Sequence, residues 1–448
     1  MNDVCDKKRV LMIAHYFPPG TSSGTLRTVK FAKYLPDTNW EPFILTMQPE
    51  AYHPNRIDSS LLAELSHELK VSRTAVWMPD RFLAGLKRHI SALASDRSKM
   101  VRPAVKAVAR QAGLARHIRD WLQFPDAYGG WLVPGFWQAQ KLMRAQKFDL
   151  IYSTAPSPVA HMIALLLRKW CRRPWVADFR DPWECLFPES VYREGEHPWR
   201  QQAEIACAER VVQGADLIIA NTERLCRAFR DRFPKGPSGK FVTIPNGFDT
   251  EDFRGLPPVP DPAAKFTICH AGTFFEQLRS PDEVLAAIHE LVEDGQIDSA
   301  HLRVILVGCG AYETRNSPYL EVIPRVGHKE SLQIMANSHV LLLLQQSPKY
   351  WLQVPAKTYE YLAIRRWILA VAPEGATSDV VTAFPNAITV QPGQAQDLKS
   401  AILRLYRLHG SGRLYPCPIS DDSVRQFSRK EQTRTLSTHF TRLIGSGQ

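Results

Sequence analysis

The chain has 448 residues, of which 44% are hydrophobic, so its length favours two to three domains and its composition excludes a disordered polypeptide. It has no apolar run of about 18 residues, which excludes a membrane-spanning helix, and its eight cysteines include no C-x-x-C pair, which disfavours a zinc site or a disulfide framework. The net charge of +11 directs attention to two classes of partner, nucleic acid and anionic membrane surfaces.

The first half of the chain alternates short apolar runs with amphipathic segments. Its first apolar run is too short for the core of a signal peptide and is better interpreted as a strand, so we expect a cytoplasmic protein. The strands predicted in this half are Val10–His15, Pro42–Thr46, Ala75–Met78, Asp149–Ser153, Trp175–Phe179, Leu217–Ala220 and Phe241–Ile244. The helical patterns between them include Leu26–Leu35, Ala160–Trp170 and Ala203–Gln213. Strands separated by helices predict a parallel sheet covered on both faces.

The loop after the first strand, FPPGTSSGTLR, contains two glycines that allow a ligand to approach the backbone closely, Gly20 and Gly24. Its spacing is not G-x-G-x-x-G, which disfavours a dinucleotide site, and no Gly-Lys-Ser/Thr follows, which disfavours a Walker loop. A plain strand-to-helix turn is the alternative interpretation.

The stretch Arg81–Arg119 holds ten basic residues and a single acid, Asp96. Apolar residues recur within it near helical spacing, as in helices that lie in a membrane interface. Pro103 and Gly113 divide the stretch, which favours two or three short helices. We expect its partner to be an anionic membrane surface at which the protein is peripheral. A solvated basic face is the alternative, and nucleic acid is disfavoured because no DNA-reading module is recognisable.

Three charged residues lie at the carboxyl end of the buried strand Trp175–Phe179, where parallel sheets bind ligands: Asp178, Arg180 and Asp181. The structural alternatives are that Arg180 bridges the two carboxylates and that Asp181 caps the next segment. His161, in the first turn of its helix, could point into the same cleft, although a lone histidine is more often structural.

The proline cluster Leu256–Ala264 predicts a linker, after which the alternation restarts. The predicted strands are Phe266–His270, Arg303–Val307, Leu320–Pro324, Val340–Leu344, Trp367–Val371 and Ala387–Val390, and the predicted helices include Pro281–Val292, Lys329–Ala336, Ala356–Ile364 and Leu398–Tyr406. We therefore expect two doubly wound α/β domains, residues 1–255 and 256–427, facing a cleft. A last helix, Ser428–Leu443 within the segment 428–448, is expected to pack back on the first domain.

Two places in the second half favour a phosphate. Lys357 stands in the first turn of a predicted helix, where a cation beside unpaired backbone N–H groups can bind an anion, and Glu360 one turn later can accept hydrogen bonds from sugar hydroxyls. The alternative is a surface ion pair between them. Gly272 and Thr273 follow another strand, and Arg279 precedes a helix that Ser280 and Glu283 are expected to cap as a capping box.

Together these residues resemble the retaining nucleotide-sugar glycosyltransferases of family 4, whose two Rossmann-like domains form the GT-B fold. The resemblance covers nearly the whole chain and includes motifs similar to those of a bacterial subgroup involved in cell-surface polysaccharides. Its motifs are YFPPGTSSGTLR, PDAYGGW (Pro125–Trp131), DLIYSTAPSP (Asp149–Pro158), DFRDPW (Asp178–Trp183), IPNGFD (Ile244–Asp249) and HAGTF.

The resemblance implies transfer of a sugar, with retained anomeric configuration, from a nucleotide diphosphate to a saccharide or lipid-linked acceptor, with no cofactor and no bound metal. It assigns donor binding to Gly24, Gly272, Thr273, Arg279, Lys357 and Glu360, and catalysis to Asp181, Arg180, His161 and Arg279. Glu360 occupies the second position of the family's paired glutamates, whereas the first is Leu352. A nucleotide-sugar epimerase of the same fold and a non-catalytic partner subunit are the two alternatives.

Overall fold

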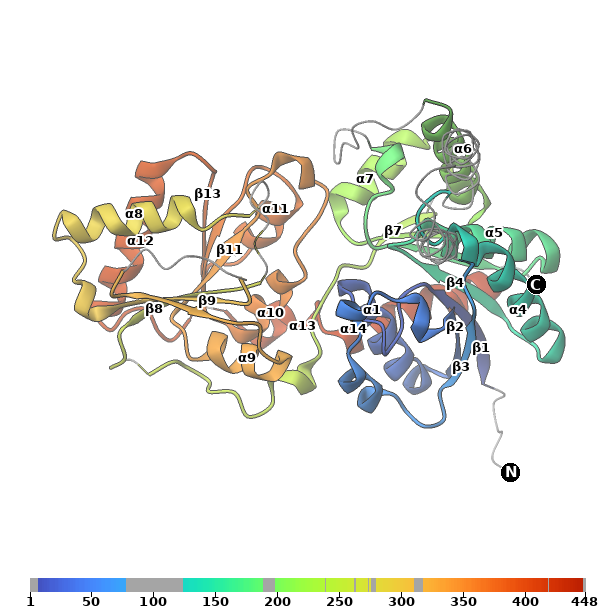
Figure 1. Ribbon diagram of the computed structural model, residues 1–448, viewed down its shortest axis with the longest axis horizontal. Helices are drawn as coiled ribbons and strands as arrows, with labels where there is room; N and C mark the ends of the chain where they lie inside the picture. The colour runs from blue at the N-terminus through green and yellow to red at the C-terminus, as the bar shows by residue number, and fades with distance from the viewer. Residues whose placement is uncertain are drawn as a thin grey trace, which may run out of the picture.

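The computed structural model describes residues 7–77, 124–187, 198–237, 239–261, 263–272, 274, 279–309, 317–417 and 419–445. The basic stretch Arg81–Arg119 and the predicted donor ligand Thr273 lie outside these residues. The described chain forms two α/β domains placed side by side (Figure 1). The prediction of two doubly wound domains is therefore confirmed.

The first domain is built on a seven-stranded parallel sheet in the order β3-β2-β1-β4-β5-β6-β7. Its strands are β1 (Lys8–Ala14), β2 (Trp40–Met47), β3 (Lys70–Thr74), β4 (Leu150–Thr154), β5 (Trp175–Phe179), β6 (Leu217–Ala220) and β7 (Phe241–Thr243). Its helices are α1 (Ser23–Tyr34), α4 (Leu132–Ala145), α5 (Pro158–Cys171), α6 (Pro198–Gly214) and α7 (Glu223–Arg232).

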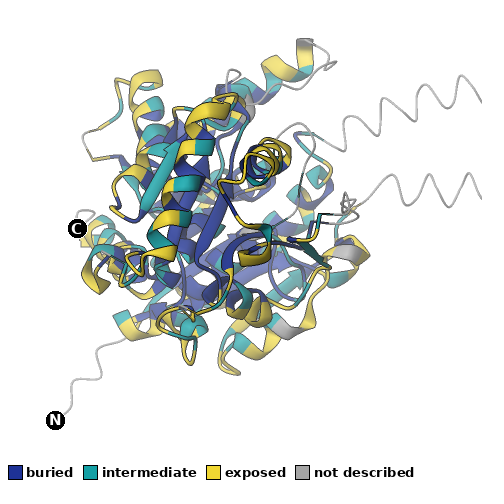
Figure 2. Cartoon of the chain, turned by 90° about the vertical axis from the view of Figure 1, so that its left-hand side faces the viewer, coloured by how far each residue is buried: buried dark blue, intermediate teal, exposed yellow. Residues whose placement is uncertain are grey.

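Alternate residues of β1 enter two different cores, because successive side chains of a strand point to opposite faces of the sheet. Leu11 and Ile13 pack in the core that α4 and α5 cover. Val10 and Met12 pack on the opposite face, with α1 and the C-terminal helix. The second domain, which faces the viewer in Figure 2, likewise has buried strands beneath helices with exposed outer faces. Burial on both faces explains why these strands are continuous apolar runs.

The predicted strand Ala75–Met78 is wrong, because the edge strand β3 covers Lys70–Thr74 instead. Its sequence, KVSRT, is largely polar and only Thr74 is buried, so it carries no apolar signal. Backbone pairing with β2, from Phe43 opposite Lys70 onward, places the strand. An edge strand needs neighbours only on one side, which relaxes its demand for apolar side chains.

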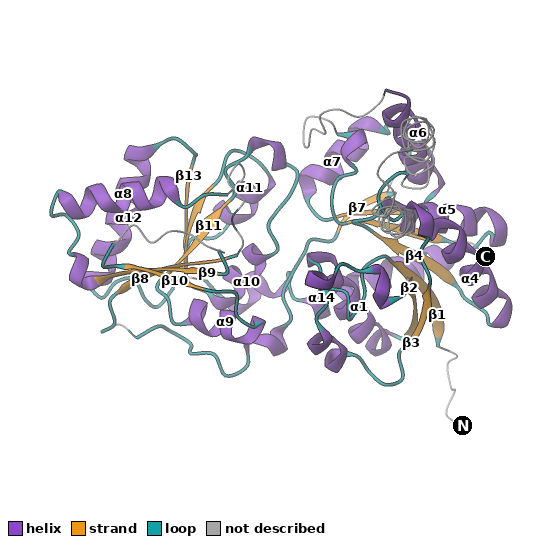
Figure 3. Ribbon diagram, in the orientation of Figure 1, coloured by secondary structure: helices purple, strands orange, loops and turns teal. Residues whose placement is uncertain are grey.

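The second domain has a six-stranded parallel sheet in the order β10-β9-β8-β11-β12-β13. Its strands are β8 (Phe266–Ala271), β9 (Leu302–Val307), β10 (Leu320–Ile323), β11 (Val340–Leu344), β12 (Trp367–Val371) and β13 (Ala387–Val390). Its helices are α8 (Asp282–Glu293), α9 (His328–Ala336), α10 (Lys357–Ile364), α11 (Ala376–Thr382), α12 (Ala395–Gly410) and α13 (Asp421–Arg425). Figure 3 shows these helices on both faces of the strands.

The predicted capping box at the start of α8 is wrong. The helix begins at Asp282 with Pro281 as its N-cap, and no side chain caps it through a hydrogen bond. The Ser280 hydroxyl accepts instead from the backbone N–H of Asp282, at 3.2 Å, in a local turn. A proline at the cap position has no side-chain oxygen to offer, so the box has no acceptor at the right place.

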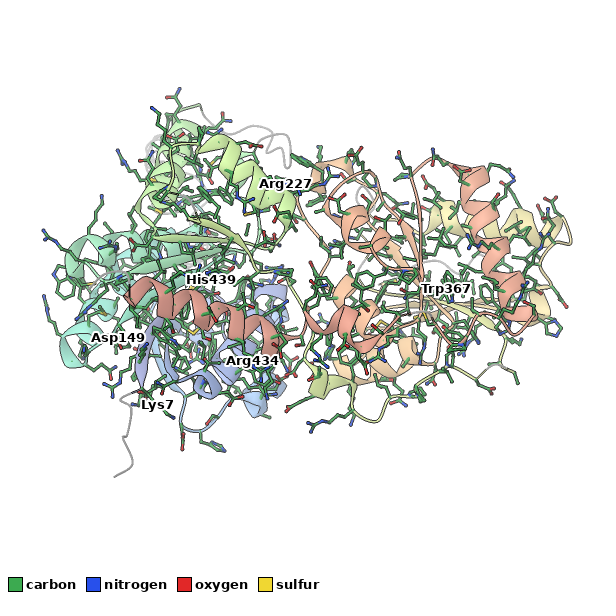
Figure 4. The ribbon with its side chains drawn as sticks, turned by 180° about the vertical axis from the view of Figure 1, so that it is seen from behind. Lys7, Asp149, Arg227, Trp367, Arg434 and His439 are labelled. Atoms are coloured by element: carbon green, nitrogen blue, oxygen red, sulfur yellow. The ribbon has the colours of Figure 1, made fainter. Side chains whose placement is uncertain are left out.

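The C-terminal helix α14 (Arg429–Gly445) lies on the first domain, against α1. Its Phe440 ring packs 5.2 Å from the ring of Trp40 and 6.0 Å from that of Tyr152. Seen from behind, α14 runs across the first domain with Arg434 and His439 along its length (Figure 4). The chain therefore passes between the domains twice.

Candidate functional site

A cleft of about 600 Å³ lies between the two domains, at the carboxyl ends of strands from both sheets. Both sheets reverse their strand order there, after β1 in the first domain and after β8 in the second, and such switch points are where open α/β sheets bind ligands. Among the residues that line the cleft are six of the predicted site residues: Arg180, Asp181, Gly272, Arg279, Lys357 and Glu360.

Helix α10 places a cation and an acid on the second-domain wall of the cleft. The Lys357 ammonium lies 3.4 Å from one carboxylate oxygen of Glu360, and Nε2 of His328 lies 3.0 Å from the other. Burial by itself would raise the pKa of Glu360, but the charge of Lys357 and the bond to His328 lower it overall. The predicted ion pair is thus present, within the cleft rather than on an open surface, and Glu360 remains a carboxylate.

Arg279 stands beside them with a neutral partner. Its guanidinium donates two hydrogen bonds, of 3.3 and 3.2 Å, to the side-chain oxygen of Gln345. Burial lowers the pKa of Arg279, and the structure gives it no ion pair with a carboxylate among the described residues. A desolvated cation without a counter-charge is poised to bind an anion.

Gly272 and Gly24 are both positions where a neighbouring side chain approaches the backbone closely. A Cβ added to Gly272 would sit 3.3 Å from Nε2 of His270, so the missing side chain leaves room beside that ring. A Cβ added to Gly24 would sit 3.2 Å from a guanidinium nitrogen of Arg180. Gly24 therefore makes room for Arg180, and it does not itself line the cleft in the described structure.

On the first-domain wall, the acid at the end of β5 is already paired. Asp178 is fully buried and accepts two hydrogen bonds from Arg27, of 2.7 and 2.9 Å, and one of 2.5 Å from the Tyr152 hydroxyl. Arg180 pairs with Asp181 at 3.1 Å. The suggestion that Arg180 bridges both carboxylates is therefore wrong, because Arg27 binds Asp178.

His161 lines a neighbouring cavity of about 300 Å³, together with Asp181, Trp183 and Gln353. Its Nδ1 lies 2.8 Å from the hydroxyl of Ser153, which also accepts a hydrogen bond from an indole N–H. Either group can donate in the bond between Ser153 and Nδ1, because a hydroxyl oxygen can accept two hydrogen bonds and donate one. Nε2 has no partner among the described residues, and burial lowers the pKa of His161 to about 4. The His161 ring is therefore neutral near pH 7.

Several known structures share the overall fold of the two domains. The structure of Anabaena HepE in complex with UDP matches with a TM-score of 0.63 and 15% identity, over 97% of this chain and 100% of that chain. Sucrose-phosphate synthase from Thermosynechococcus elongatus matches with a TM-score of 0.61 and 14% identity, over 98% and 100%. The apo lipopolysaccharide outer core galactosyltransferase WaaB matches with a TM-score of 0.55 and 11% identity, over 98% and 100%.

The fold is GT-B. Within the chain, residues 81–252 match the family model described as Glycosyltransferase Family 4. No curated protein matches the sequence significantly. At these low identities the structural matches define the GT-B architecture, and the chemistry must be argued from the residues of the cleft.

Two segments of the chain connect the two domains of this GT-B structure, and they run side by side. The segment IPNGFD passes to the second domain, and residues 427–429 return. Phe248 N–H donates to the Phe427 carbonyl at 3.1 Å, and Arg429 N–H donates to the Phe248 carbonyl at 2.8 Å. A Cβ on Gly247 would lie 2.0 Å from the Phe427 carbonyl oxygen, so only glycine fits between the crossings.

Leu352, where the resemblance leads one to look for a glutamate, does not face the GT-B cleft. It is fully buried in the first-domain core, and its carbonyl accepts a 2.8 Å hydrogen bond from the Thr222 hydroxyl. The position thus joins the two domains. The next residue, Gln353, lines both cavities.

Among the cleft residues to which the sequence analysis gave no role are Gln353, His270 and Arg429. His270 stands at the end of a buried strand just before a glycine, a signal that could have identified it. Arg429 lies outside every recognised motif and reaches the cleft only because the chain returns there. Burial lowers its pKa to about 9.

The described residues contain no group of three or more His, Cys, Asp or Glu side chains arranged to hold a metal ion. None of the described helices has both the length and the apolar character needed to cross a membrane.

Proposed function

We propose that the protein is a glycosyltransferase that moves a sugar from a nucleotide-diphosphate donor to a saccharide or lipid-linked acceptor. The observation that carries the proposal is the second-domain wall, where Arg279 and Lys357 stand beside Gly272 with Glu360 one helical turn away. The family match over residues 81–252 supports it. So does the shared fold of HepE, whose structures contain UDP and UDP-glucose.

In this proposal the second domain binds the donor. Arg279 and Lys357 neutralise the charge that develops on the diphosphate as the sugar leaves, a preorganised electrostatic effect. Glu360, kept ionised by Lys357 and His328, accepts hydrogen bonds from the ribose hydroxyls. Gly272 and Thr273 let the diphosphate approach the backbone. Cations supply the counter-charge here, so we propose a reaction that requires no metal ion.

The first domain orients the transferred sugar or the acceptor. Asp181 lines both cavities and can accept a hydrogen bond from a hydroxyl, while Arg180 holds it in place. His161 binds a second hydroxyl through Nε2, as donor or acceptor according to its tautomer. Gly24 contributes by making room for Arg180. Closure of the domains on the donor would exclude water and favour transfer over hydrolysis. As in the family it resembles, we propose that the anomeric configuration is retained and that the product is a cell-surface polysaccharide.

A panel of radiolabelled nucleotide sugars tests this proposal, because neither the base nor the sugar is specified by the residues above. Transfer to an added saccharide, or slow hydrolysis of one donor, is the expected result. An isomerised donor would instead identify an epimerase, and binding without turnover would identify a non-catalytic subunit; either outcome would overturn the transferase.

The basic stretch Arg81–Arg119 is proposed to hold the enzyme at an anionic membrane surface, beside a lipid-linked acceptor. Each basic side chain near such a surface contributes on the order of 1 kcal/mol, and salt weakens the attraction. The protein should therefore sediment with anionic liposomes at low salt and be released at high salt. Replacing Lys87, Arg88, Lys99 and Arg102 by Glu should abolish sedimentation. Equal sedimentation of this variant would make the stretch an ordinary basic surface.

A further inference from the structure

His270, the penultimate residue of β8, is a buried imidazole with one unused nitrogen. Its Nδ1 lies 2.9 Å from the carbonyl oxygen of Leu342. A carbonyl oxygen can only accept a hydrogen bond, so Nδ1 carries the ring hydrogen. Nε2 of the neutral ring therefore has a free lone pair. Nε2 is buried without a partner among the described residues, although the residue lines the cleft. A buried polar atom that is left unpaired calls for a ligand or another explanation.

The residues around His270 hold its ring in place and leave Nε2 open. The Phe274 ring stacks on the imidazole at 4.9 Å, and Gly272 leaves the space beside Nε2 open. The Tyr361 hydroxyl accepts from the backbone N–H of Ala271 at 3.2 Å, and the Cys309 thiol donates to the Gly272 carbonyl at 3.3 Å. These contacts hold the backbone on both sides of the ring and leave Nε2 unoccupied.

The charges that face the ring come from two elements and are mostly positive. Arg279 precedes α8, and Lys357 begins α10. Glu360, the acid of α10, is neutralised by Lys357 and His328. Burial, reinforced by the two cations and opposed by the bond to Leu342, lowers the pKa of His270 to about 4. Near neutral pH the His270 side chain is therefore neutral and lines the cleft together with two cations.

We propose that His270 is a proton-coupled ligand of the donor diphosphate: its Nε2 takes one proton from solvent when the diphosphate binds and donates the new N–H to a phosphate oxygen. The inference rests on the proposed function only in taking the cluster of Arg279, Lys357 and Gly272 as the diphosphate subsite. A phosphate placed there brings negative charge between the cations and His270. Protonation then replaces the repulsion between a lone pair and an anion with a charge-assisted hydrogen bond.

The direction of the pH dependence follows. Because the pKa of His270 is higher in the complex than in the free protein, affinity rises as pH falls through the pKa of the complex. The gain approaches tenfold per pH unit and ends near the free pKa of about 4. A free nucleoside diphosphate carries more negative charge than its sugar ester. Its binding should therefore raise the pKa of His270 further, so that a larger fraction of His270 is protonated. His270 thus favours the state in which the sugar has left.

Calorimetric titration in two buffers with different heats of ionisation measures the protons taken up on binding. The titrants are UDP, GDP, ADP and inorganic pyrophosphate, at pH 6.5, 7.0 and 7.5. The wild type is compared with His270→Asn, whose amide retains a donor toward the Leu342 carbonyl but has no group at Nε2. His289→Asn, on the exposed surface of α8, is the matched control.

For the diphosphate that binds most tightly, the wild type and His289→Asn should take up as much as about one proton more than His270→Asn. The affinity of His270→Asn should be about tenfold lower at pH 6.5, with a gap that narrows as pH rises. The difference between proteins is the measurement, because the ligand and His328 titrate in both. Equal uptake by wild type and His270→Asn overturns the inference.

Two further results distinguish this inference from a purely structural role of His270 and from a failure of the proposed transferase activity. Ligand-free His270→Asn should melt within a few degrees of the wild type; loss of affinity with no difference in proton uptake in the folded variant would make His270 structural and overturn the inference. Sugar transfer without the His270-dependent proton overturns the inference alone. His270-dependent uptake with UDP or pyrophosphate, in a protein that transfers no sugar, supports it and overturns the transferase instead.

Discussion

In the first domain the buried cations of α1 have counter-charges, whereas across the cleft the Arg279 guanidinium is hydrogen-bonded to the neutral side chain of Gln345. Arg27 and Asp178 are both fully buried and bonded to one another. Lys30, also buried, lies 2.9 Å from Asp249. These two cations of α1 therefore hold the structure together.

On the second-domain wall of the cleft, several polar and charged groups lack a full set of partners. Arg279 has no carboxylate partner in the described structure, Nε2 of His270 has none of any kind there, and Lys357 shares Glu360 with His328. Burying such groups without counter-charges costs stability, and a bound anion recovers that cost. The comparison teaches that fully buried, paired charges such as Arg27 and Asp178 belong to the scaffold, whereas a buried cation without a counter-charge, such as Arg279, is suited to bind an anion.

The largest expected effect comes from breaking the scaffold pair. Asp178→Asn leaves the Arg27 charge buried and uncompensated, which should lower the free energy of unfolding by about 3–5 kcal/mol. Urea denaturation measures it. Asp379→Asn, which removes an exposed ion pair with Arg224, should cost less than about 1 kcal/mol. Similar costs for the two variants would remove the distinction between scaffold and surface pairs.

Arg279→Gln should leave stability nearly unchanged and lower kcat about 100-fold, equivalent to about 3 kcal/mol, because its charge is needed most as the diphosphate leaves. Steady-state kinetics with the donor identified by the panel measures it. Arg303→Gln, which removes an exposed pair with Glu321 on the same domain, is the control and should retain full activity. A change confined to KM would assign Arg279 to ground-state binding.

Glu360→Gln should weaken binding of donor and nucleoside diphosphate alike, by about tenfold, because hydrogen bonds to a charged acceptor contribute about 1.5–3 kcal/mol. Since the ribose does not change during transfer, kcat should change little. Calorimetry with the nucleoside diphosphate provides the test, with the exposed Glu290→Gln as control. Wild-type affinity in the Glu360 variant would remove this residue from the ribose site.

The smallest expected effect is that of chelation. If Arg279 and Lys357 neutralise the leaving diphosphate, excess EDTA should leave the initial rate of transfer unchanged. Loss of activity that magnesium or manganese restores would contradict this account and assign the leaving group to a metal ion.

Much of the architecture could be predicted from the sequence because it follows from local patterns. Apolar runs gave the observed bounds of five strands, β5, β6, β11, β12 and β13, and Lys357 indeed begins a helix. These features depend on periodicity within about ten residues. The capping box before α8 failed by one position, which is the scale at which local signals lose their resolution.

The sequence by itself determined that two parallel-sheet domains would form and which strand ends would carry polar side chains. Only the tertiary structure decided what those side chains are paired with. Arg27 and Asp178 are 151 residues apart, and Leu352 is 130 residues from the Thr222 hydroxyl that binds it. No local pattern records such contacts, because they arise when distant strands and crossings are brought together. The same holds for His270: the hydrogen bond that sets its tautomer, and the cations that face it, come from other elements of the fold.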